Sequence, residues 1–226
     1  MKPQSLLVLR RALLPWAAAA VAAVSPPGLI AQTETEPTLN GQLLVAAREG
    51  QLERSRQLIA QGAVVDSRNR VGKSPLFIAC EKSNTELGIA LIEAGANVNM
   101  ASIAGVTPLM AASYSGNAAL VKRLLAAGAR TDAVDRMNKS AMVYAAGQGH
   151  AAVLDALLAS GIDVNATYEH QLTLLMWAAG QGQGDAVRLL LARGARIDLR
   201  DDRGMTALEI ARGAGQSATV EAAGLR

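Results

Sequence analysis

Glycine recurs at an unbroken interval of 33 residues along most of this chain. The series consists of Gly62, Gly95, Gly128, Gly161 and Gly194. An alanine series that runs from Ala46 to Ala211 keeps the same step. A strict period of this length is typical of stacked copies of one small unit, because a single mixed core imposes no such repetition. The sequence therefore predicts a repeat protein in which each unit packs only against its neighbours.

Each unit carries the signals of two short helices. A hydroxyl residue recurs before the first helix, and proline follows it at Pro75 and Pro108, which suits an N-cap and the first helical position. Pairs of large aliphatic residues mark the second helix, as at Leu124-Leu125. The glycine series then closes that helix, as expected for a left-handed helix stop. A polar, alternating segment leads from each glycine to an exposed turn.

These features together resemble the ankyrin repeat. The best match runs from Gly105 to Ala112 (GVTPLMAA) and continues with Leu124-Leu125-Ala126-Ala127-Gly128-Ala129. The resemblance covers about Leu39 to Arg226 and implies an all-α solenoid of about six helix-pair repeats with short hairpin-like turns. The expected units are 39–68, 69–101, 102–134, 135–167, 168–200 and 201–226.

One family position departs from the pattern. Histidine usually follows the Pro-Leu pair, but no unit of this chain has histidine at that position. The residues there are Leu44, Phe77, Met110, Val143, Met176 and Glu209. We expect apolar contact to replace most of the hydrogen bonds between repeats that the family assigns to this histidine.

Residues 1–31 have the pattern of a secretory signal peptide. Lys2, Arg10 and Arg11 precede an apolar run from Ala12 to Val24, and prolines and a glycine then interrupt any helix. Ala31 is the expected cleavage point, and residues 32–38 form a polar linker. An uncleaved anchor is the alternative, although the run is short for a membrane span. The arginine pair also leaves twin-arginine export open beside the ordinary route.

The leader accounts for the whole excess of three positive charges, so residues 32–226 are electrically neutral. A neutral body argues against nucleic acid as the main ligand, because such binding needs a field of basic residues. Cys80 is the single cysteine, which excludes an internal disulfide and leaves the compartment undecided. The leader alone predicts a periplasmic or secreted protein. We expect a monomer with no stable membrane span after cleavage.

No set of residues predicts catalysis, a metal site or a cofactor. Gly72-Lys73-Ser74 imitates the end of a phosphate loop, but the required earlier glycine is replaced by Ser67. His150 and His170 are far apart in sequence, and we interpret both as solvent-facing. Cys80 occupies a small-residue position and is expected to be buried. A non-catalytic protein is therefore predicted.

Two aromatic residues share one repeat position. Tyr144 and Trp177 align with Val45, Ile78, Ala111 and Ile210. We favour core packing between adjacent first helices, because most residues at this position are apolar. The other interpretation is a pocket for a flat ligand. On that interpretation the chain is a small-molecule or cofactor-binding accessory protein that assists an exported enzyme.

The resemblance implies a partner-binding surface formed by the turn tips and the exposed ends of the first helices, on a concave face. The residues that we expect to contact a protein partner are Tyr114, Arg70, Lys73, Glu81, Lys82, Ile103, Val106, Arg136, Met137, Lys139, Gln148 and Gln181. Tyr114 is the expected anchor, because an exposed amphipathic aromatic residue is a frequent hot spot. The basic tips favour an acidic rim on the partner. The leading hypothesis is an exported, non-catalytic scaffold that binds one protein.

Overall fold

The computed structural model describes residues 38–226, and this part of the chain contains α-helices and no named β-strand. The α-helices are α1 (Leu39–Glu49), α2 (Leu52–Ala60), α3 (Pro75–Glu81), α4 (Thr85–Glu93), α5 (Pro108–Tyr114), α6 (Ala118–Ala126), α7 (Ala141–Gln148), α8 (Ala151–Leu158), α9 (Leu174–Gly180), α10 (Gly184–Ala192), α11 (Ala207–Gly213) and α12 (Ser217–Ala222). A short 3₁₀ helix, η1 (Glu169–Gln171), precedes α9.

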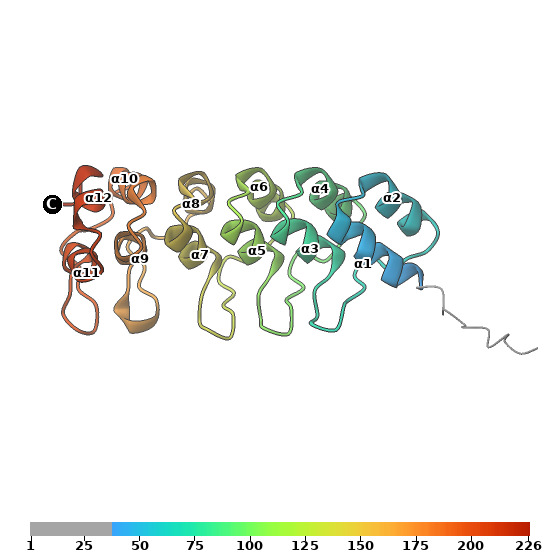
Figure 1. Ribbon diagram of the computed structural model, residues 1–226, viewed down its shortest axis with the longest axis horizontal. Helices are drawn as coiled ribbons and strands as arrows, with labels where there is room; N and C mark the ends of the chain where they lie inside the picture. The colour runs from blue at the N-terminus through green and yellow to red at the C-terminus, as the bar shows by residue number, and fades with distance from the viewer. Residues whose placement is uncertain (1–37) are drawn as a thin grey trace, which may run out of the picture. The chain divides into compact units, whose positions relative to one another are not determined.

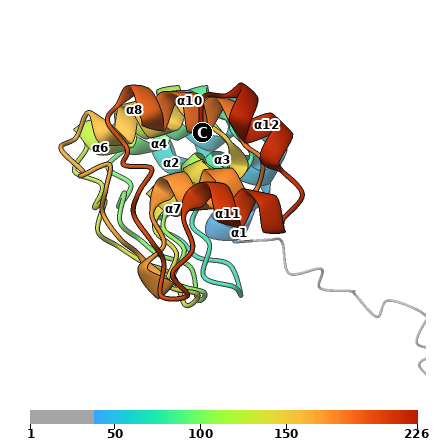
Figure 2. The ribbon, with the colours of Figure 1, turned by 90° about the vertical axis from the view of Figure 1, so that its left-hand side faces the viewer.

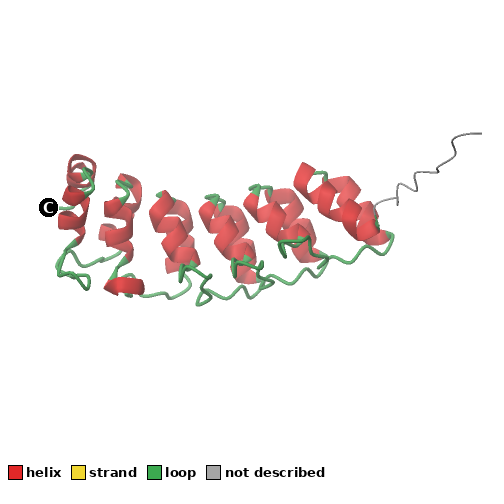
Figure 3. Cartoon of the chain, turned by 60° about the horizontal axis from the view of Figure 1, so that its bottom comes forward, coloured by secondary structure: helices red, strands yellow, loops and turns green. Residues whose placement is uncertain are grey.

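Consecutive helices form pairs, and the pairs stand side by side in a row (Figure 1). The odd-numbered first helices form one layer, and the even-numbered second helices form the other (Figure 2). The turns between pairs project beyond the first helices as a line of tips (Figure 3). The predicted all-α solenoid is thereby confirmed, while the division into six units stays a prediction. The expected leader and nearly all of the linker lie outside the described residues.

Hydroxyl side chains start the first helices, as the sequence predicts. Ser74 Oγ accepts a hydrogen bond from the Phe77 amide at 3.2 Å, and Pro75 follows in the first turn of α3. Such an N-cap satisfies one of the amides that a helix start leaves without a partner. The period-33 glycines follow the second helices with φ between 84° and 98°, the left-handed conformation that glycine adopts most readily.

The expectation that apolar contact replaces most of the hydrogen bonds of the family's histidine is only partly correct. Met110 Sδ accepts a hydrogen bond from the Thr107 amide at 3.4 Å, and Met176 Sδ does the same for Thr173. The Glu209 carboxylate accepts from the Thr206 amide at 2.7 Å. In these three units the side chain closes a local capping box at the start of its own helix.

One recurring set of hydrogen bonds between neighbouring repeats comes from the N-cap residue of the second helix. Asn117 Nδ2 donates to the Ser83 carbonyl at 3.1 Å, and Gln183 Nε2 donates to the Gly147 carbonyl at 3.0 Å. His150, at the same repeat position, contacts the Tyr114 carbonyl through Nε2 at 2.9 Å. Each of these side chains satisfies a carbonyl near the end of a first helix, which that helix cannot satisfy itself.

Small residues let the first helices approach closely. Ala112, Ala145 and Ala178 are fully buried on α5, α7 and α9, and those helices pack against one another in sequence order. Leu124 and Leu157 are fully buried on the second helices. The core therefore extends along the row between the two helical layers. Side chains on the outer face of the first helices lie outside this core.

Candidate functional site

Two neighbouring cavities open between the tips and the first helices. They have volumes of about 250 and 330 Å³, and Tyr114 and Tyr144 line both of them. We call the two together the first-helix groove. Its lining comprises Lys73, Phe77, Glu81, Ser102, Ala104, Val106, Met110, Ala111, Tyr114, Lys139, Val143, Tyr144, Gly147, Gln148, Trp177 and Gln181.

Asp135 shapes the tip that leads into α7. Its buried carboxylate accepts hydrogen bonds from the amides of Met137 and Lys139, at 2.8 and 2.9 Å. The Tyr144 hydroxyl donates to the other oxygen of the same carboxylate. Burial and, second, this bond raise the pKa of Tyr144, because both disfavour the phenolate. One side chain therefore fixes both the tip and the ring that forms the middle of the groove.

Replacing Asp135 with alanine is expected to destabilise the fold by about 2 kcal/mol, because two amides and a hydroxyl lose their acceptor. Asparagine is the matched control, since Asn69 uses its own side-chain oxygen for the corresponding two amides. Urea denaturation followed by circular dichroism measures both effects. An alanine variant as stable as the asparagine variant would contradict this role.

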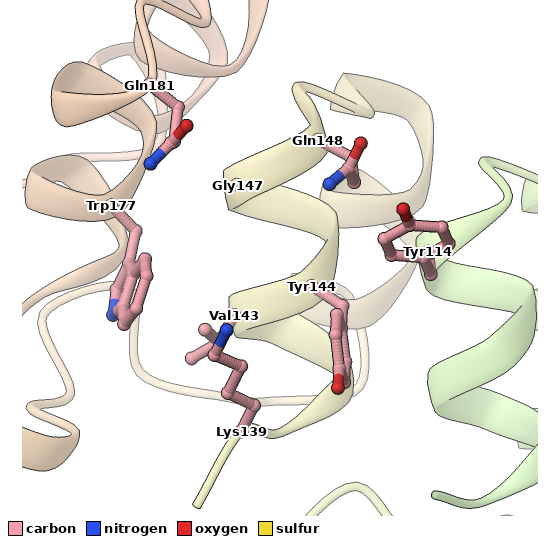
Figure 4. A pocket seen from close by; sticks show the side chains of 8 residues that line it. All are labelled: Tyr114, Lys139, Val143, Tyr144, Gly147, Gln148, Trp177 and Gln181. Atoms are coloured by element: carbon pink, nitrogen blue, oxygen red, sulfur yellow. The ribbon is translucent and has the colours of Figure 1, made fainter. Parts of the chain in front are cut away.

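Aromatic rings and one lysine form the part of the groove between α5 and α9. The rings of Tyr114 and Tyr144 meet edge to face, with centroids 5.8 Å apart and an interplanar angle of 86°. Lys139 Nζ lies 6.0 Å from the Tyr144 ring centroid and 5.6 Å from that of Trp177. Figure 4 shows the lysine side chain between these two rings. Cation–π attraction to both rings therefore holds the ammonium group in place.

The structure brings most of the predicted partner-binding residues together. Seven of them line the groove: Lys73, Glu81, Val106, Tyr114, Lys139, Gln148 and Gln181. Ile103 and Arg136 line a further cavity of about 240 Å³ between the tips. Arg70, Lys82 and Met137 are exposed but line none of these three cavities. Tyr114 is 55% exposed, so the expected anchor is accessible to solvent.

The expectation of core packing for Tyr144 and Trp177 is only partly correct. Both pack against the core, but both also line the groove and are only partly buried. The sequence does hold a signal for this. Gly147 and Gly180 each follow one of the aromatic residues by three positions, on the same helical face. Because glycine has no side chain, it leaves the neighbouring ring uncovered.

The histidines differ from each other. His150 is half-buried and joined to the preceding repeat, so the interpretation of a solvent-facing residue is only partly correct for it. His170 is exposed in a tip, as expected, and its Nδ1 lies 2.9 Å from Asp202 Oδ2 in the next tip. Within residues 38–226 no group of three or more potential metal ligands gathers. In the same residues, no helix combines the length and apolar character needed to cross a membrane.

Cys80 is fully buried in α3, as the repeat position predicts. Burial raises the pKa of its thiol, because the thiolate loses its hydration. At a given pH the folded chain therefore contains less of the reactive form than the unfolded chain. We expect a chromogenic disulfide reagent to react with Cys80 only after denaturation. Rapid absorbance change with the folded chain would contradict the burial of this side chain.

A family model for ankyrin repeats, which describes three copies, matches three overlapping ranges of the chain: 43–135, 91–168 and 142–222. In a comparison with curated proteins, nothing matches the chain. Ankyrin repeats are generally scaffolds for protein–protein interaction, and proteins built from them are typically non-catalytic. The matched ranges together span most of the 226 residues and coincide with the stacked helix pairs. The chain therefore belongs to the ankyrin-repeat family.

Proposed function

We propose that this protein is a non-catalytic scaffold that binds one protein partner through the first-helix groove and the tips beside it. The observation that carries the proposal is the exposure of Tyr114 within this groove, beside the ring of Tyr144. A large aromatic side chain that is half exposed on a folded surface is a typical anchor of a protein interface. The fold does not require an aromatic residue at this repeat position, because the equivalent residues of other units include Glu81, Gly147 and Gly180.

Apolar tips extend this surface. Ile103 and Met137 are 53% and 60% exposed, and Val71 is also exposed. Exposed apolar side chains on tips that border the groove favour a protein partner, since exposed apolar area marks interaction sites. Arg70 and Arg136 stand among them and form no salt bridge within residues 38–226. They supply a basic rim, which favours an acidic counterpart and faster association.

We also propose that the chain is exported from the cytoplasm and acts in the periplasm or outside the cell. The support is the leader alone, with three basic residues before a 13-residue apolar run. Cell fractionation and the mass of the purified protein test this proposal. We expect a chain that begins at Gln32 in the exported fraction. A full-length chain found only in the cytoplasm would contradict it.

Co-purification from the native cells tests the binding surface. We expect one protein to accompany the wild-type chain and to be lost from a variant with Tyr114→Ala and Met137→Ser. The matched control is Arg123→Ala, because Arg123 lies on α6 in the layer of second helices. A partner that is retained by the groove variant and lost from the control would place the interface on the other layer and reject this proposal.

A further inference from the structure

Lysine occupies the same repeat position in two units, but the charged groups around it differ between them. Lys73 and Lys139 are 66 residues apart, so they occupy the same repeat position two units from each other. Lys73 Nζ lies 2.6 Å from Glu81 Oε1 and 5.2 Å from the Phe77 ring centroid. Lys139 lies against two rings, but no carboxylate oxygen of residues 38–226 is within salt-bridge distance of its ammonium group. The second lysine therefore lacks the counter-charge that the first one has.

The residue that would supply a carboxylate to Lys139, by analogy with Glu81, can be identified from the repeat. Glu81 follows Lys73 by eight residues, and the residue that follows Lys139 by eight is Gly147. Gly147 lines the groove inside α7, and a Cβ atom built on it would meet nothing within 4 Å. In Figure 4 the bare backbone of Gly147 stands above the side chain of Lys139. The space that a glutamate occupies in one unit is thus open to the groove in the other.

The neighbouring groups suit an anion. Gln148 and Gln181 are exposed at the same cavity, and their amide groups provide further hydrogen-bond donors. The nearby acid, Asp135, is buried and already accepts bonds from two amides and the Tyr144 hydroxyl. The rings hold Lys139 before any ligand arrives, so little side-chain entropy is lost on binding.

We infer that Lys139 receives the side-chain carboxylate of an aspartate or glutamate from the protein partner, in the space that Gly147 leaves open. The inference rests on the proposed function, because the acidic side chain belongs to the protein that binds the groove. The partner's carboxylate takes the position that the Glu81 carboxylate has beside Lys73. A charge-assisted hydrogen bond in a partly desolvated groove contributes both affinity and register.

The substitution Gly147→Glu tests the inference from inside the chain. The new carboxylate is expected to pair with Lys139 as Glu81 pairs with Lys73, and so to exclude the partner's acid. Gly147→Ala is the matched control, because it adds a side chain without charge at a position where helical alanine is favourable. Lys139→Met removes the cation and keeps a long apolar side chain. Thermal melting of each full-length variant establishes that it is folded.

The probe is a random twelve-residue peptide library displayed on phage and selected on the full-length wild-type chain. Displayed peptides are fused at their C-termini, so any acidity comes from side chains. We expect the clones that depend on Tyr114 to share one acidic position. Replacing that acid by its amide should weaken binding to the wild-type and Gly147→Ala chains about tenfold or more. The same replacement should change binding to the Lys139→Met and Gly147→Glu chains less than twofold.

Two results would overturn the inference, and they differ in what they mean for the proposed function. Clones that depend on Tyr114 but share no acid, and that bind the Gly147→Glu chain as well as the wild type, would reject the carboxylate site and leave the protein-binding groove in place. A selection in which every clone binds independently of Tyr114 would reject the groove as well.

Discussion

Replacing Leu124 with alanine is expected to lower the free energy of unfolding by about 3 kcal/mol. Leu124 is fully buried on α6, which packs against both α4 and α8. The substitution leaves a cavity in the middle of the row, and a repeat stack depends on the contacts between neighbours. Urea denaturation of the full-length chain, followed by circular dichroism, measures the loss.

Val134→Ala is the control for this substitution. Val134 is 48% exposed, so truncating it should change stability by less than about 0.5 kcal/mol. Equal stability losses for the two variants would show that the central leucine is not part of a tightly packed core.

Replacing Tyr114 with alanine is expected to weaken partner binding by about 2 kcal/mol, or roughly thirtyfold in the dissociation constant. The ring is half exposed and lies across the groove, so its loss removes contact area from the partner without opening the core. The contact of His150 is with the Tyr114 carbonyl, and a side-chain substitution leaves that group present. Titration calorimetry with the purified partner measures the change.

Arg123→Ala is the matched surface substitution for this comparison. Arg123 forms an exposed ion pair with Glu93 in the layer of second helices, and such pairs contribute little to stability. We expect this variant to bind the partner as the wild type does. If both variants bind with wild-type affinity, Tyr114 is not an anchor.

The sequence predicts the fold well because repetition states each physical requirement several times. A single glycine after a helix is weak evidence, but five at one interval require a left-handed residue at the same place in five units. Their φ values between 84° and 98° meet this requirement. The hydroxyl before each first helix is equally informative, since the capping bonds at Ser74, Thr107 and Thr206 follow from residue type and position.

The candidate site is harder to predict. The position of a residue in the repeat shows which face of the helix it lies on, but not how far its side chain extends out of the core. Tyr144 and Trp177 occupy a position where Ile78 is buried, yet they reach the groove. Their rings are larger than isoleucine, and the glycines one turn later leave them uncovered. The phase of the repeat does place Tyr114 and Lys139 on the groove side correctly.

The repeat pattern also does not show which charged residues form ion pairs. Lys73 and Lys139 are equivalent in sequence, and the sequence predicts partner contact for both of them. Only the structure shows that Glu81 neutralises the first and that the second has rings as neighbours. An alignment of the units does reveal that Gly147 replaces Glu81, but the meaning of that change depends on the distance between Lys73 and Glu81.

Photocrosslinking in living cells tests the central claim most directly. A benzophenone amino acid is introduced at Tyr114 in the groove or, for comparison, at Lys122 on α6 in the other layer. Protein binding in the groove predicts that the residue at 114 crosslinks to one protein and that the residue at 122 does not. A partner captured from position 122, with none captured from position 114, would contradict it.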